Sequence, residues 1–362
     1  MSQHPGPDTT AFGTYVHIPF CSSRCDYCAF ATWTDRHHLM SAYLDAVAAE
    51  IDRRVADGMP PSTSIFVGGG TPSLVSAQGL VDVLAHIPRA ADAEVTIEAN
   101  PDAVTAESLQ TYRDGGVTRM SFGVQSMDPD VLSSLGRTHD PDNVRRAVEW
   151  TLAAGFETFN LDLIMGAAGE SVASWERSLA EVVGLGPTHI SAYSLTIEPG
   201  TPLAEDPSRH PDDDDQATKY LRTVDVLADA GFEWYEVSNW SRPGHQCRHN
   251  RLYWDAGDYL GFGCAAHSHR AGRRWWNLRT PERYIDAVTT GVSTEATGEV
   301  LDAETRRIEA LQLTLRTDRG VPTSSLDLDD PVLEGLVDIE GDRAILTAEG
   351  RLLANEVAIR LR

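Results

Sequence analysis

Three cysteines close to the N-terminus form the most specific chemical pattern in the sequence. Cys21, Cys25 and Cys28 lie within "HIPFCSSRCDYCAFATW" at residues 17–33, and Phe30 follows where a fourth thiol could stand. Three thiolates on one loop can converge on a soft metal centre, and a [4Fe–4S] cluster normally takes four of them. With three thiolates, one iron keeps an open coordination position, which catalytic metal centres keep and structural centres close. The pattern therefore predicts a cluster with one iron free to bind a chelating ligand.

Two alternatives remain for the same cysteines. A structural zinc ion takes four ligands, commonly from two close pairs, and the other two cysteines, Cys247 and Cys264, are far away in sequence and form no close pair. Simple buried thiols would leave the close spacing of the triplet unexplained. Five cysteines, three of them clustered, do not resemble a disulfide framework, so we expect a reducing compartment.

Apolar, strand-like runs alternate with amphipathic helical stretches between residues 14 and 200. This alternation predicts an α/β fold with parallel strands and crossover helices. Six such units are two short of a full eight-stranded barrel. The expected strands are 14–19, 64–69, 94–99, 117–124, 158–166 and 189–195, and the expected helices are 39–57, 76–87, 105–114, 141–154 and 171–184.

Polar motifs gather at the expected strand ends, where chemistry collects in folds of this kind. "GGGTPS" at residues 68–73 lets backbone approach a ligand, because glycine has no Cβ. Glu98 ends the third strand, and "RMSFGVQS" places Arg119 and Gln125 around the end of the fourth. Asp162 stands inside the fifth strand, where a lone carboxylate is expensive to bury unless a partner meets it. Each residue alone fits a structural role, but together, behind a three-cysteine loop, they predict a ligand site.

The sequence changes character after residue 200. Residues 201–290 hold five of the eight tryptophans and several histidines, and we expect them to extend the barrel domain. Residues 291–362 begin with helical segments and end in "LVDIEGDRAILTAEGRLLANEVAIRL", which reads as strand, tight turn, strand and helix and resembles a small winged-helix module. A packing role for this end is a simpler interpretation than DNA binding. Residues 1–13 are expected to form a flexible tail.

The formal net charge is −24. A surface this acidic repels phosphate backbones and anionic lipid headgroups, so we do not expect nucleic acid as a partner. No apolar run approaches the length needed to cross a bilayer, and the start "MSQHPGPDTTAFG" has neither a basic region nor an apolar signal core. The sequence therefore predicts a cytoplasmic protein.

The spacing Cys21-x3-Cys25-x2-Cys28, with Tyr27 before the third cysteine, resembles the signature of the radical S-adenosylmethionine (SAM) enzymes, whose fold is a partial (β/α)6 barrel. The resemblance implies that these cysteines hold a [4Fe–4S] cluster and that the reduced cluster cleaves SAM to methionine and a 5′-deoxyadenosyl radical. The protein would position SAM and exclude water and oxygen. The residues implied to contact SAM are Tyr15, Tyr27, Gly69, Gly70, Thr71, Glu98, Gln125, Arg137 and Asp162.

Motif order and spacing resemble one branch of that family, oxygen-independent coproporphyrinogen III oxidase (HemN) and a related haem chaperone (HemW). The oxidase carries a further cysteine where this chain has Phe30, and a long extension before the cluster loop. The chaperone branch has neither, and it carries the motif H-N-x-x-Y-W, present here as "HNRLYW" at residues 249–254. The resemblance implies haem contacts at His249, Asn250, Tyr253 and Trp254, with a ring nitrogen of His249 as the candidate axial ligand. Cys247, His267 and His269 are alternative ligands.

The expected function is that of a haem chaperone, which binds the cluster, SAM and haem and passes haem to acceptors such as respiratory enzymes. An electron donor for the cluster and peripheral membrane association through the acceptors are further expectations. The alternative is the oxidase reaction, decarboxylation of two propionates of coproporphyrinogen III, and the full set of SAM residues favours it. An unrelated radical SAM oxidoreductase is a third interpretation, which the haem-type motif disfavours. The sequence leaves open whether SAM is cleaved or only bound.

Overall fold

The computed structural model describes residues 11–362. Most of the expected tail, residues 1–10, lies outside the described residues, and the first strand already begins at Phe12. No helix within residues 11–362 combines the length and the apolar character needed to cross a membrane.

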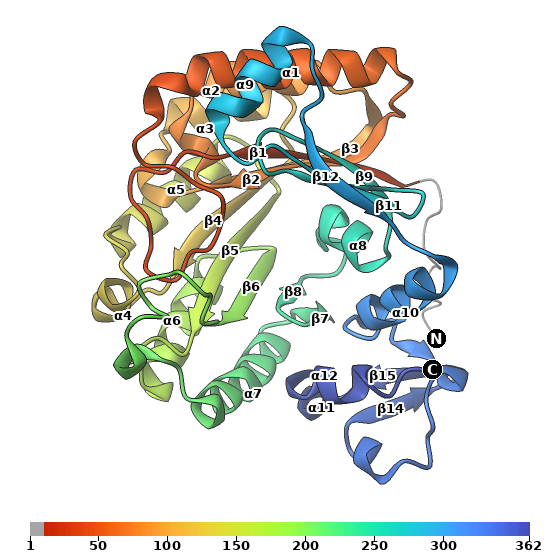
Figure 1. The fold of residues 1–362 in the computed structure, drawn as a ribbon. Coiled ribbons are helices and arrows are strands. Elements are labelled where there is room, and N and C mark those ends of the chain that lie inside the picture. The colour runs from red at the N-terminus through yellow and green to blue at the C-terminus, as the bar shows by residue number, and fades with distance from the viewer. Residues whose placement is uncertain (1–10) are drawn as a thin grey trace.

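The six expected strands are all present, and they pair in parallel in sequence order. The expected helices lie between them, and Figure 1 shows them on the outer side of the curved sheet. The strands are β1 (Phe12–Ile18), β2 (Ser62–Gly69), β3 (Arg89–Ala99), β4 (Arg119–Gln125), β5 (Thr158–Met165) and β6 (His189–Ser194). The helices are α1 (Met40–Ala56), α2 (Ala77–Ala85), α3 (Ala106–Asp114), α4 (Pro129–Ser134), α5 (Pro141–Ala153) and α6 (Val172–Gly184).

The period of two along each strand separates an apolar outer layer from a polar interior. In β5, Phe159, Leu161 and Leu163 are buried in the main hydrophobic core, which also contains helix residues such as Trp175. Because successive side chains of a strand point to opposite faces, Asn160 and Asp162 must face the inside of the curved sheet. The same alternation in β3, β4 and β6 gives the barrel a polar lumen.

Residues 201–300 extend this sheet at both of its edges. Two strands add antiparallel to the β6 edge, and β9 pairs in parallel with β1 at the other edge. The largest sheet in the described part of the chain therefore has twelve strands. The added elements are α7 (Asp213–Asp229), β7 (Glu233–Glu236), β8 (Asn239–Ser241), α8 (Arg248–Trp254), β9 (Asp258–Phe262), β10 (His267–Arg270), β11 (Arg273–Asn277), α9 (Pro281–Thr290) and β12 (Glu295–Val300).

Helix α8, which holds the haem-type motif, lies against the starts of β1, β2 and β3. Its first backbone N–H groups, of Arg248 and His249, donate to Glu94 Oε1 at 3.0 and 3.4 Å. Gly13 makes room for the helix, because a Cβ there would lie 2.3 Å from Leu252 Cδ2. Contacts between residues about 155 positions apart thus bring α8 to the amino-terminal end of the barrel.

The C-terminal unit has its own small core and a three-stranded antiparallel sheet. The expected strand, turn, strand and helix are present as β14, β15 and α11. Residues 295–300, which we expected within the helical start of this unit, instead form strand β12 of the large sheet. Arg251 of α8 forms a two-pronged ion pair with Asp318, at 2.6 and 2.7 Å, that ties this unit to the barrel. Its elements are α10 (Ala303–Thr314), β13 (Val321–Pro322), β14 (Val337–Glu340), β15 (Arg343–Leu346), α11 (Ala348–Leu352) and α12 (Ala354–Ala358).

Candidate functional site

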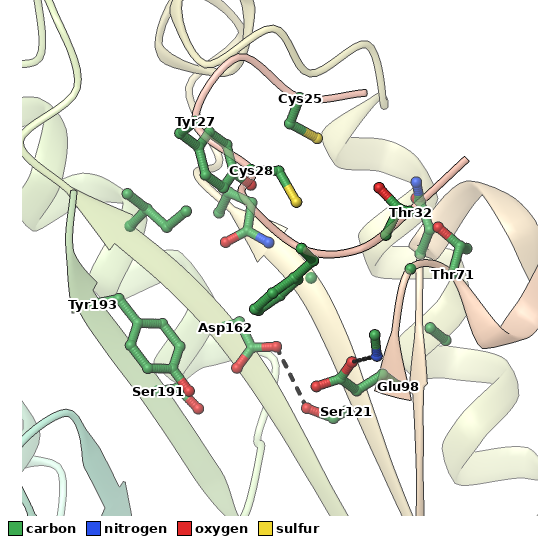
Figure 2. Close-up of a pocket in the computed structure, with 18 of the residues that line it drawn as sticks. Cys25, Tyr27, Cys28, Thr32, Thr71, Glu98, Ser121, Asp162, Ser191 and Tyr193 are labelled. Carbon is green, nitrogen blue, oxygen red and sulfur yellow. Dashed lines mark hydrogen bonds between the residues drawn. The ribbon is translucent and has the colours of Figure 1, made fainter. Parts of the chain in front are cut away.

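A cavity of about 800 Å³ fills the lumen of the partial barrel. It extends from the cysteine loop, at the carboxyl ends of the strands, to α8 at their amino ends. All three cysteines of the triplet and all nine residues expected to contact SAM line it. Figure 2 shows side chains from several strands converging on this space below the loop. The structure therefore brings the predicted cluster and SAM residues together around one cavity.

The cysteine loop connects β1 to α1 and is held by backbone hydrogen bonds across its base and within it. Cys21 N–H donates to Trp33 O at 3.1 Å and Cys28 N–H donates to Cys25 O at 3.2 Å. Arg137 Nη1 lies 3.4 Å from Cys25 Sγ, a contact that suits a thiolate. Burial raises the pKa of the Cys21 and Cys28 thiols, which favours their protonated form in the absence of a metal.

The residues present fit an iron–sulfur cluster held by this loop. All five cysteines are free thiols, and in Figure 2 Cys25 and Cys28 lie on the loop above the cavity. Among residues 11–362, no group of three or more His, Cys, Asp or Glu side chains is arranged to hold a single metal ion. A cluster has a different requirement, because each thiolate binds a different iron.

The glycine motif lies directly beneath the cysteine loop. Gly69 has a φ of +111°, which favours glycine. A Cβ on Gly70 would lie 2.6 Å from Phe20 O and 3.0 Å from Cys21 Sγ. Thr71 N–H then donates to Phe20 O at 2.8 Å. Glycine is thus required here by the close approach of the cysteine loop, in addition to the ligand approach that the sequence suggested.

Glu98 and Asp162 are the two carboxylates that face the cavity from the strands. Glu98 Oε2 accepts from Gly69 N–H at 3.2 Å, and Asp162 accepts from Asn160 Nδ2 at 2.7 Å and Ser121 Oγ at 3.4 Å. Burial, with a smaller contribution from Asp162, raises the pKa of Glu98 to about 8. Burial also raises the pKa of Asp162, although its hydrogen-bond donors act in the opposite direction. Either carboxyl can therefore bind a cationic group of a ligand or accept a hydrogen bond from a ligand hydroxyl.

Replacing Glu98 with glutamine is expected to stabilise the protein at high pH. The folded protein holds the Glu98 proton up to about pH 8, whereas the ordinary pKa is 4.5, so the free energy of unfolding falls as pH rises through that interval. The side chain opens into the cavity, which reduces the effect to a few kcal/mol at most. Anaerobic urea unfolding at pH 5 and pH 9 measures it. Glu107→Gln, on the exposed surface of α3, is the control, and an equal pH response of both variants would contradict the assignment.

Gln125 and Arg137 line the cavity from β4 and the segment after α4. Gln125 has a φ of 65° at an irregularity in the pairing of β4 with β5, and its Oε1 is buried without a hydrogen-bond partner within residues 11–362. Arg137 Nη2 donates to Gly123 O at 2.7 Å. The Gln125 amide oxygen is therefore free to accept from a ligand.

The two tyrosines of the predicted SAM set also line the cavity. Tyr15 OH lies 3.1 Å from His17 Nδ1, and Tyr27 lies on the cysteine loop between Cys25 and Cys28. Burial raises the pKa of both phenols, so both remain neutral hydrogen-bonding groups.

Three residues of the haem-type motif line the same cavity. His249, Asn250 and Tyr253 lie at its α8 end, whereas Trp254 is not part of its lining. The His249 ring stacks on Phe66 at 5.4 Å, and its Nδ1 lies 3.0 Å from Ser64 Oγ. His249 Nε2 is buried and has no hydrogen-bond partner in the described part of the chain. Burial lowers the pKa of His249 to about 3, so the ring is neutral, as a metal ligand must be.

The alternative haem ligands of the sequence do not line the cavity. Cys247 is fully buried beside Glu94, and burial raises the pKa of its thiol to about 12. His267 stacks on Trp276 at 5.4 Å, and His269 Nδ1 lies 3.0 Å from Gly257 O. Of the four candidates, His249 is therefore the one that combines a free ring nitrogen with access to the cavity.

Several lumen residues escaped sequence reasoning. Asn160, His189, Ser191 and Tyr193 line the cavity, and the period of two in β5 and β6 was the available signal for them. Arg119 was expected near the end of the fourth strand, but it is the first residue of β4, at the opposite end from Gln125. The expected position was wrong because Arg119 and Gln125 are the first and the last of the seven residues of β4.

A directed chain of hydrogen bonds crosses the lower lumen. His189 Nδ1 lies 2.7 Å from Asn160 Oδ1, and His189 Nε2 lies 2.7 Å from Tyr235 OH. Asn250 Nδ2 donates to Tyr235 OH at 3.4 Å. Because Asn160 Nδ2 donates to Asp162, the pattern is satisfied when His189 is neutral and protonated on Nδ1. Burial indeed lowers the pKa of His189 well below its ordinary value.

Comparisons with known proteins agree on the superfamily and the fold of this chain. Residues 15–182 match the family model of the Radical SAM superfamily. A Mycobacterium tuberculosis protein named heme chaperone HemW is 41% identical over 370 aligned residues, which cover 96% of this chain and 93% of that protein. The Escherichia coli protein of the same name is 35% identical, with 95% and 96% covered. The solved structure of E. coli coproporphyrinogen III oxidase HemN covers 96% of this chain and 89% of its own, with a TM-score of 0.84 at 23% identity, which shows a shared fold.

Proposed function

Because this chain belongs to the HemW family of the radical SAM superfamily, we propose that it is a haem chaperone that binds a [4Fe–4S] cluster, SAM and haem. One observation carries the proposal. The haem-type motif and the SAM-type residues line a single cavity, and His249 Nε2 is buried there without a partner within residues 11–362. An unsatisfied ring nitrogen in a neutral histidine is a candidate metal ligand.

Cys21, Cys25 and Cys28 hold the cluster in this proposal. When bound and reduced, the cluster supplies the electron for SAM cleavage. The chain's own residues do the positioning: Gly69, with Gly70 and Thr71, offers backbone groups for the methionine part of SAM. Glu98, Asp162 and Gln125 offer oxygens to its amino, sulfonium and ribose groups, and Arg137 supplies a positive charge beside the cluster loop. Tyr15 and Tyr27 close the sides of the cavity against water.

The oxidase reaction is the second candidate, and the complete SAM set favours it. Phe30 argues against it. The oxidase carries a cysteine at this position, whereas Phe30 is 64% exposed here and lines the outer part of the cavity. A phenyl ring can neither ligate iron nor relay a proton. The chaperone therefore remains the better-supported function.

The partners of this chaperone follow from its cargo. Haem is taken up and passed to acceptors such as respiratory enzymes, and an electron donor reduces the cluster. We place the protein in the cytoplasm, with peripheral membrane association through its acceptors. The formal net charge of −24 disfavours direct binding to anionic lipid or nucleic acid.

Anaerobic turnover of coproporphyrinogen III, alongside haem titration, tests the proposal. The reconstituted protein, with its iron content checked, is expected to bind haem with a new Soret band and to release it to an apo-haem protein. It is expected to form no protoporphyrinogen with SAM and reductant. Product formation would make the oxidase the function. A cluster-loaded protein that neither binds haem nor forms product would reject both candidates.

A further inference from the structure

Arg119 is a buried cation at the amino end of the lumen. The residue is 2% exposed and lines the cavity. Its Nε is buried without a hydrogen bond, and none of the hydrogen bonds or ion pairs found within residues 11–362 involves its guanidinium. A buried charge with no partner is costly, and buried arginines are normally paired with carboxylates.

The acidic neighbours of Arg119 are engaged elsewhere. Glu94 Oε1 accepts from the backbone of Arg248 and lies 3.5 Å from Cys247 Sγ. Asp162 accepts from Asn160 and Ser121. Neither carboxylate lies within 4.0 Å of the arginine, so these groups neutralise its charge only at longer range. The guanidinium is therefore available to something that enters the cavity.

Other unsatisfied polar atoms lie at the same end of the barrel. Thr96, which is the strand partner of Arg119, is fully buried behind the cavity lining, and its Oγ1 has no hydrogen bond within residues 11–362. His249 Nε2 is the second such atom. Buried polar atoms without partners mark places where a ligand or water completes the structure.

We infer that Arg119 forms a carboxylate-binding subsite at the α8 end of the lumen. The planar guanidinium offers two parallel N–H donors, which match the two oxygens of a carboxylate. The inference rests on the proposed haem binding for its preferred ligand, a propionate of the tetrapyrrole whose iron His249 would meet. It assigns to the lumen a contact with the edge of the macrocycle in addition to the contact with its metal.

The carboxylate of SAM is the other source of the same chemistry, and the position of Arg119 disfavours it. Arg119 pairs with Thr96, and Ser121 pairs with Glu98, so Arg119 lies about 7 Å below the layer of Glu98. Gly70 and Thr71, which are expected to bind the methionine part, lie at the opposite end beneath the cysteine loop. Figure 2 shows Glu98 and Asp162 between the loop and the lower lumen.

Binding titrations of three ligands to cluster-loaded protein test the inference. The ligands are Fe(III)-protoporphyrin IX, its dimethyl ester, which lacks the charged propionates, and SAM. The variants are Arg119→Gln, which removes the charge, and Arg119→Lys, which keeps it without the planar fork. Arg242→Gln is the matched control, because this half-buried arginine donates to Ala230 O and lies outside the cavity. Iron content and far-UV circular dichroism establish that each variant is folded.

The expected result is selective. Arg119→Gln should weaken binding of the haem ten- to a hundredfold and leave binding of the dimethyl ester and of SAM unchanged. Arg119→Lys should recover part of the lost haem affinity. Arg242→Gln changes none of the three. Equal haem affinity in Arg119→Gln and wild type would overturn the subsite while leaving the chaperone proposal intact. A loss confined to SAM would overturn the propionate assignment in favour of the SAM carboxylate, and absence of haem binding in wild type would reject the proposed function itself.

Discussion

Replacing Cys25 with serine is expected to abolish the iron–sulfur cluster. Serine is a poor ligand for iron, and two thiolates cannot hold a cluster that already has one iron without a protein ligand. Iron content should fall from about four atoms per chain to nearly none, and the broad visible absorbance should disappear. The measurement is anaerobic reconstitution followed by iron analysis and absorbance spectroscopy. SAM affinity should fall in parallel, since the proposed SAM site includes the open iron.

Cys264→Ser is the matched control for this change. Cys264 is also a free thiol, but it is fully buried beside Tyr43, whose OH lies 3.6 Å from Cys264 Sγ. A serine hydroxyl can keep that contact, so this variant should retain its cluster. A full spectrum in Cys25→Ser, or an equal loss in both variants, would show that the triplet does not hold the cluster.

Replacing His249 with alanine is expected to weaken haem binding by tenfold or more while leaving the cluster intact. The interaction that this change removes is the proposed bond from Nε2 to the haem iron, and a tenfold loss corresponds to about 1.4 kcal/mol. The cysteine loop is at the other end of the cavity, so the iron content should not change. Haem titration by Soret absorbance, with the cluster spectrum recorded on the same sample, provides both readouts.

Two further variants separate ligation from packing. His249→Gln retains a polar side chain that can reach Ser64 Oγ, now 3.0 Å from Nδ1, but offers no imidazole to iron, so it should behave like the alanine variant. His267→Ala removes an exposed histidine that stacks on Trp276, and its haem affinity should equal that of wild type. Wild-type affinity in both His249 variants would remove this residue from the haem site.

His249 lines the same cavity as the residues expected to bind SAM. The motif lies inside the barrel, at the opposite end of the cavity from the cysteine loop. A ligand that reaches Nε2 must therefore enter the cavity that also holds the SAM-type residues. Haem and SAM are thus expected to influence each other's affinity, and each must do so by the same factor.

The sequence alone determined the parts of the protein that depend on local pattern. The spacing of Cys21, Cys25 and Cys28 predicted a cluster-binding loop, because one loop can present three thiols without help from the rest of the fold. The apolar alternation located all six barrel strands to within a few residues, because a period of two reports which side chains face the core. Glu98, Gln125 and Asp162 followed from their positions on those strands.

Only the tertiary structure decided which of these pieces meet. The position of α8 at the amino ends of β1, β2 and β3 depends on contacts such as that of Glu94 with Arg248, which no local pattern encodes. The same packing buried His249 in the lumen and kept Trp254 out of the cavity. The sequence placed Arg119 on the fourth strand, but it did not indicate that the acidic neighbours of Arg119 are engaged elsewhere. Burial and hydrogen-bond pairing depend on contacts between residues far apart in the chain, such as those of α8 with the barrel strands.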